Sequence, residues 1–158
     1  GRGDRAARAA PGRRLGNSLL DANVALPLLL DSHVHRAAAE AWWNRQADDS
    51  VVFTLPVRMA VLRLLSNRAL MGEGVLTPEA AWQALDCLVN DARAVVRNDA
   101  PVGIDSLWRA FVRDRAPSPN VWTDAWLAAF AEVERCELVT FDRGFKQFPL
   151  SHLRVLSA

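Results

Sequence analysis

Short apolar segments alternate along this chain with longer stretches whose apolar residues recur at helical spacing. The short segments are predicted strands, at residues 18–22, 51–54, 94–96, 137–142 and, at the edge, 153–156. The longer stretches are predicted helices, at about residues 24–30, 33–46, 56–67, 78–90, 104–112 and 121–135. Strands that alternate with helices pair in parallel through crossover connections. We therefore expect an α/β protein, a three-layer α/β/α sandwich around a central, mainly parallel sheet of four to five strands.

The chain is long enough for one domain with a proper core, because it has 158 residues, half of them hydrophobic. We predict a flexible, Arg-rich N-terminal segment at residues 1–16 and one folded domain at residues 17–158. Five arginines and one acid lie in the first 14 residues, which leaves 14 basic and 17 acidic residues in the remainder. Composition therefore gives no sign of a strongly basic nucleic-acid-binding surface. No apolar run approaches the ~20 residues of a membrane span, so no membrane partner is expected.

The two cysteines, Cys87 and Cys136, each lie in an apolar pattern. Buried, reduced thiols are favoured over a disulfide or a metal site, which indicates a cytoplasmic protein.

Three aspartates stand where an α/β fold places functional groups. Asp21 and Asp142 each follow an apolar strand, so both are expected at the same edge of the sheet, and Asp124 lies in a first helical turn, where the helix dipole favours a carboxylate. Three carboxylates close together repel one another, and a divalent cation reverses that repulsion. Oxygen ligands favour Mg²⁺ or Mn²⁺. Each aspartate alone could be a turn or cap residue, so the prediction depends on all three together.

Residues 20–24 (LDANV), 122–128 (WTDAWLA) and 139–143 (VTFDR) resemble three acidic motifs of PIN-domain ribonucleases. The resemblance is closest to VapC-type toxins of bacterial type II toxin–antitoxin pairs, and it covers nearly everything from Asn17 onward. It implies a metal-dependent endoribonuclease that cleaves RNA, is inhibited by a small VapB-like antitoxin and forms a homodimer. The antitoxin is expected to lie in an apolar groove near the first helices.

Carried over by motif, Asp21 and Asp124 would be the principal ligands of Mg²⁺ or Mn²⁺, and Asp142 would bind the metal directly or through water. Asn23 would orient Asp21 and its loop by hydrogen bonding, and Thr140 would play a similar supporting role.

The chain departs from the family pattern in one respect. Many PIN nucleases carry a further acid, usually Glu, on the helix after the second strand, and residues 55–72 contain no Asp or Glu. This argues against a fully occupied second metal site. It also keeps open an alternative, a PIN-like binding module with an incomplete metal site and little or no catalysis. A phosphatase with an aspartate nucleophile is less favoured, because such enzymes usually carry a second acid two residues after the nucleophile, where this chain has Asn23.

Other candidates are weaker. Arg143, directly after Asp142, is a candidate phosphate contact. His33 and His35 lack a third metal ligand nearby, so a structural or surface role is favoured for them. The six tryptophans mostly fall on inward-facing stripes, Trp122 among them, so core packing is favoured over base stacking.

Overall fold

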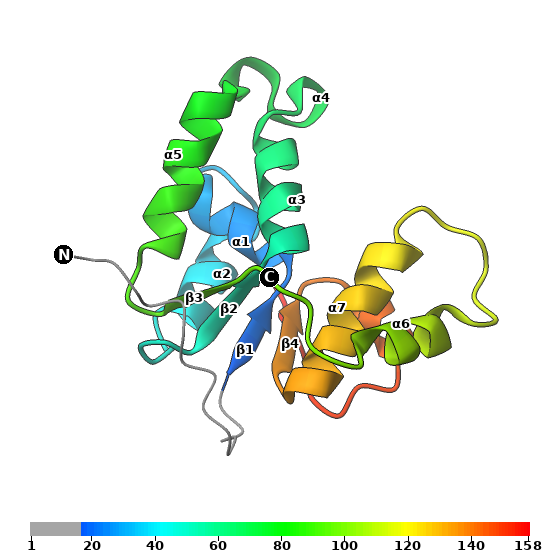
Figure 1. Cartoon of the computed structure of the whole chain (residues 1–158). Helices are drawn as coiled ribbons and strands as arrows, with labels where there is room; N and C mark the ends of the chain where they lie inside the picture. The colour runs from blue at the N-terminus through cyan, green and yellow to red at the C-terminus, as the bar shows by residue number, and fades with distance from the viewer. Residues whose placement is uncertain (1–16) are drawn as a thin grey trace.

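Five parallel strands in the order β3-β2-β1-β4-β5 form the centre of the computed structural model, which describes residues 17–158 (Figure 1). The strands are β1 (Ser18–Leu20), β2 (Val51–Thr54), β3 (Ala94–Arg97), β4 (Glu137–Thr140) and β5 (Leu153–Val155). All pairings between neighbours are parallel, and β1 lies in the middle of the sheet. The predicted fold is therefore confirmed, with five strands. The segment predicted to be flexible, residues 1–16, lies outside the described residues.

Two helical layers cover the sheet (Figure 1). The described residues form α1 (Ala22–Leu29), α2 (Arg36–Trp43), α3 (Leu55–Leu65), α4 (Arg68–Met71), α5 (Pro78–Val89), α6 (Ile104–Val112) and α7 (Val121–Glu134). Two short 3₁₀ helices are η1 (Gly72–Gly74) and η2 (Arg143–Gln147). Helices α1, α2, α3 and α5 pack together, whereas α6 packs on α7.

The direction of the crossovers explains these layers. The chain steps outward from β1 to β2 to β3 and then returns to β4 on the other side of β1. Since parallel crossovers are right-handed, the first two connections cover one face of the sheet and the third covers the opposite face. The reversal lies between β1 and β4, the type of position where open α/β sheets place a ligand.

The core consists of apolar side chains from the central strands and the helices against them. Leu19, Val51, Phe53 and Leu138 have no exposed surface. Helix α7 is buried almost all round over residues 127–131, where small alanines let it lie close to the sheet. The carboxyl ends of β1 and β4 are therefore held by packing on both faces.

Local details differ from the sequence-based expectations. The first strand ends at Leu20 rather than at residue 22, because Asp21 caps α1 and turns the chain. The helix expected from residue 33 begins at Arg36, because His33 Nδ1 accepts the backbone N–H of His35 at 3.0 Å and holds a turn there. The short helix η2 was not predicted.

Two burial predictions are wrong. Cys136 is buried, but Cys87 is exposed, because α5 buries the stripe Ala81, Leu85 and Leu88 and Cys87 lies off it. Trp122 was expected to face inward, and it is 57% exposed at the start of α7. Within residues 17–158, no helix has the length and apolar character that a membrane crossing requires.

Candidate functional site

Asp21 connects the central strand to the helix that follows. As the N-cap residue of α1, its Oδ1 accepts the backbone N–H of Ala22 at 2.7 Å, which satisfies one of the unpaired donors of the helix start. Its Oδ2 accepts the hydroxyl of Thr140 at 2.8 Å, and its own backbone N–H donates to Val139 O at 3.0 Å. The carboxylate is thus held between β1 and β4.

Thr140, the last residue of β4, is fully buried and joins the parts of this edge. Its Oγ1 donates to Asp21 and accepts both the side-chain Nδ2–H of Asn23 and the backbone N–H of Asp142, each at 3.0 Å. A hydroxyl has one donor and two acceptor positions, so all three are used. Asn23 also accepts the backbone N–H of Phe141 at 3.1 Å. The amide therefore pins the loop after β4 to the start of α1.

Asp142 begins the loop that leads into η2, and it is exposed. Its Oδ1 accepts the backbone N–H of Gly144 at 2.7 Å. A Cβ atom at residue 144 would lie 2.9 Å from that same oxygen, closer than real Cβ contacts come. A side chain at residue 144 would therefore push the Asp142 carboxylate out of its present position. Arg143, also exposed, lies between the two.

Asp124 reaches the same place from the opposite helical layer, in the first turn of α7. Burial and, to a smaller extent, the charges of Asp21 and Asp142 together raise the pKa of its carboxyl to about 6. Burial also raises the pKa of Asp21, against the lowering effect of its hydrogen bonds to Thr140 and Ala22, and Asp142 adds a smaller upward contribution. The fold therefore brings the three predicted aspartates within electrostatic range of one another.

This group of carboxylates carries more negative charge than its surroundings neutralise. None of the three takes part in the ion pairs found among the described residues. Over residues 17–158, no three His, Cys, Asp or Glu side chains already stand in metal-ligand geometry. What the structure provides is a partly buried anionic edge of hard oxygen donors, which a cation and its water ligands can complete.

The sequence did not point to two neighbours of this edge. Gly144 is one, although Asp142 was considered a possible turn residue. His35 is the other: its ring stacks on Phe141, with ring centres 4.3 Å apart and planes inclined by 14°. No pattern in the sequence connects His35 to Phe141, because the contact depends on how the turn before α2 folds over the end of β4.

Comparison with known proteins decides the family. The model of the PIN domain matches residues 18–150. Ribonuclease VapC41 of Mycobacterium tuberculosis is 39% identical over 143 residues, which cover 88% of this chain and 98% of the relative. The chain is a PIN-domain protein of the VapC family.

Solved structures agree with the fold of this VapC-family chain. VapC20 of Mycobacterium tuberculosis superposes with a TM-score of 0.64 at 17% identity, covering 87% of this chain and 99% of that one. VapBC2 of Rickettsia felis gives a TM-score of 0.61 at 14% identity, with 89% and 98% covered. At such identities these likenesses concern the fold alone. The resemblance identified from the three acidic motifs is confirmed.

Proposed function

We propose that this VapC-family protein is a metal-dependent endoribonuclease that acts in the cytoplasm as the toxin of a toxin–antitoxin pair. The observation that carries the proposal is the convergence of Asp21, Asp124 and Asp142, from two strand ends and one helix, with a pKa of about 6 at Asp124. The names of the relatives support the reaction, since the similar chain VapC41 is a ribonuclease and VapC20 is a toxin that cleaves the sarcin–ricin loop.

Asp21 and Asp124 would be the principal ligands of Mg²⁺ or Mn²⁺, and Asp142 would bind directly or through water. Mg²⁺ commonly takes one or two carboxylates and keeps several waters, so the set does not have to be closed before substrate arrives. Each oxygen of Asp21 accepts one hydrogen bond and retains a further lone pair. When bound, a divalent ion supplies neutralising charge for the phosphate and activates water for attack on phosphorus.

The chain's own residues orient this edge. Thr140 fixes the direction in which Asp21 presents its carboxylate, and Asn23 keeps the loop after β4 at a constant distance from α1. Arg143, exposed beside Asp142, would contact an RNA phosphate. This arrangement pre-organises the acids, so that little reorganisation accompanies substrate binding.

The acid-free stretch at residues 55–72 forms α3, α4 and part of the turn that follows, so this region adds no carboxylate. We infer that one ion binds to the protein alone. The same stretch is the observation that favours the second candidate, a binding module without catalysis. Calorimetry that finds no Mg²⁺ or Mn²⁺ binding would favour that candidate, whereas binding of one ion supports the nuclease.

A VapB-like antitoxin is the proposed partner, bound in a groove near α1 and α2, and a homodimer is the proposed assembly. The fold-level likeness to VapBC2 of Rickettsia felis supports a partner of this class.

The nuclease is tested with a structured RNA and purified protein in Mg²⁺, in Mn²⁺ and in excess EDTA. Asp21→Asn should lower cleavage at least about a hundredfold, because it removes a charged ligand while keeping the shape of the side chain. Asp86→Asn, an exposed position on α5, is the matched control and should cleave normally. Cleavage by Asp21→Asn at the normal rate, or full cleavage in EDTA, would refute the proposal.

A further inference from the structure

A hollow of about 530 Å³ lies where the chain passes from α6 to α7. Its wall is formed within residues 112–122 and includes Arg115, Pro117, Pro119 and Trp122. It therefore adjoins the first turn of α7, the turn that also carries Asp124.

Trp122 is poorly explained as a core residue, because more than half of its surface, 57%, is exposed. Its backbone is nevertheless fixed: the indole Nε1–H of Trp108, on α6, donates to Trp122 O at 2.8 Å. A large flat ring is thus presented to solvent from a rigid helix start.

Arg115 ties the hollow to the catalytic edge. Its Nε–H donates to Phe111 O at 3.1 Å and one guanidinium nitrogen donates to Gln147 O at 2.6 Å, while the guanidinium lies 5.1 Å from the ring centre of Phe148. Gln147 ends η2, the short helix that Asp142 caps. The wall of the hollow and the loop of Asp142 are therefore parts of one braced unit.

The two segments joined by Arg115 and Gln147 are also locally basic. Residues 109–115 and 143–147 contain one acid, Asp114, and five basic side chains, which are Arg109, Arg113, Arg115, Arg143 and Lys146. The chain as a whole has a formal net charge of only +1. A local positive field beside an acidic metal site suits a polyanion, because it attracts the backbone while the carboxylates hold the ion.

We propose that this hollow is a stacking subsite for one unpaired base of the RNA substrate, with Trp122 as the residue that stacks on the base. Single-stranded RNA is bound through bases stacked on aromatic rings and a positively charged track for the backbone. Trp122 and Asp124 are two residues apart, so they lie about 3 Å apart along the helix axis and on nearly opposite sides of α7. The stacked base therefore belongs to a neighbouring nucleotide, not to the one whose phosphate is attacked. The subsite rests on the proposed nuclease function.

Binding is measured in an Asp21→Asn background, by fluorescence anisotropy of a short fluorescein-labelled single-stranded RNA of mixed sequence. Trp122→Ala should weaken binding by roughly tenfold, and Trp122→Phe should restore most of the affinity, because it keeps an aromatic face. Trp82→Ala is the matched control, since Trp82 is 49% exposed on α5 in the other helical layer, and it should bind normally. Equal loss in both alanine variants, or no loss in Trp122→Ala, would overturn the subsite.

A second arm replaces single nucleotides of the RNA by abasic sugars. At one position the abasic substitution and Trp122→Ala should not be additive, because both remove the same stack. Additive losses at every position would reject stacking. If Trp122→Ala leaves RNA affinity unchanged but shifts sedimentation, the ring covers a protein partner and the proposal fails. These results are independent of catalysis: failure of the proposed nuclease appears as full cleavage in EDTA or normal cleavage by Asp21→Asn, whereas failure of the subsite appears here as unchanged binding.

Discussion

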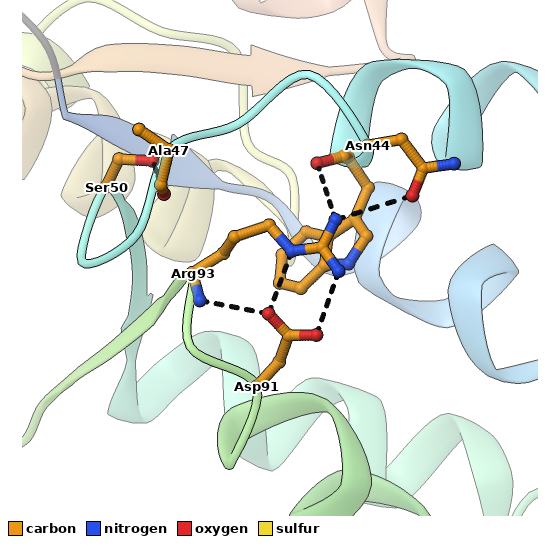
Figure 2. Close-up of polar contacts among 6 residues, drawn as sticks. Asn44, Ala47, Ser50, Asp91 and Arg93 are labelled. Atoms are coloured by element: carbon orange, nitrogen blue, oxygen red, sulfur yellow. Dashed lines mark hydrogen bonds and ion pairs between the residues drawn. The ribbon is translucent and has the colours of Figure 1, made fainter.

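The acidic side chains at the two ends of the sheet differ in whether a positive side chain is paired with them. At the amino-terminal ends of β2 and β3, the guanidinium of Arg93 makes a bidentate contact with the Asp91 carboxylate, at 2.8 and 3.0 Å (Figure 2). It also donates to Trp43 O and to Asn44 Oδ1. The guanidinium lies 4.9 Å from the ring centre of Trp43. At the carboxyl ends of β1 and β4, three aspartates converge, and no positive side chain is paired with any of them within residues 17–158.

The pKa values of the acids at the two ends are shifted in opposite directions. Hydrogen bonding to Arg93 holds the pKa of Asp91 below its usual value, whereas burial and two neighbouring charges raise the pKa of Asp124 to about 6. The fold therefore stabilises the charged form of Asp91 and destabilises the charged form of Asp124. A balanced cluster contributes to stability, and an unbalanced one is where a cation or a proton can bind.

The largest effect on stability is expected where the charge is balanced. Arg93→Met removes all the guanidinium donors and leaves Asp91 only the backbone N–H of residue 93, so it should lower the free energy of unfolding by about 2 kcal/mol. Urea denaturation followed by tryptophan fluorescence measures this, with the exposed Arg63→Met as control. Cleavage per folded molecule should stay normal. Lost cleavage with unchanged stability would place this cluster in the active machinery.

A smaller effect is expected from the turn of Asp142. Gly144→Ala introduces a Cβ that would lie 2.9 Å from Asp142 Oδ1, so the carboxylate must move, and cleavage should fall by roughly tenfold with little change in melting temperature. Gly74→Ala is the control, because a Cβ there meets nothing within 4 Å. Steady-state cleavage and thermal melting separate the two effects. Full activity of Gly144→Ala would mean that Asp142 needs no fixed position.

The smallest expected effect is a gain in stability on substitution of Asp124. The folded-state pKa of Asp124, about 6, lies above the reference value of 3.8, so its charge opposes folding above about pH 6 and the opposition fades as pH falls toward 3.8. Asp124→Asn in EDTA should therefore stabilise the protein at about pH 7.5 and not at about pH 4. Because the carboxyl is only partly buried, screening limits the gain to roughly 1 kcal/mol.

Thermal melts of both proteins across this pH range measure the difference, which isolates Asp124 from the other titrating groups. Mg²⁺ should raise the melting temperature of the unaltered protein and not that of Asp124→Asn, since only the folded, charged site binds the ion. A variant that is less stable at every pH would contradict the electrostatic account of this edge.

Much of the fold could be predicted from the sequence, because the signals are local. The apolar runs that end in Asp21 and Asp142 are short and unbroken, and the alternation with helices determines the parallel sheet. Asp124 was located by its position in a helix start. These features follow from strand and helix periods, which need no knowledge of the tertiary contacts.

What could not be predicted depends on contacts between distant segments. The Arg93 cluster joins the end of α2 to the start of β3, and His35 meets Phe141 across the fold. Trp122 was assigned inward because α7 is apolar on almost every side, so periodicity alone could not say which residues face the sheet. Trp122 lies in the first turn of α7, beside the loop from α6, which has no sequence period.

The hydroxyl of Thr140 bears on when, during synthesis of the chain, the proposed site can form. It lies 119 residues along the chain from the carboxylate of Asp21 that it orients. Because side chains alternate between faces along a strand, Thr140 can reach Asp21 only if β4 pairs beside β1 in one register. A growing polypeptide that has emerged only as far as α7 therefore holds two of the acids and no means of aligning them. During synthesis, the proposed metal site is therefore incomplete until β4 has been made and has docked beside β1.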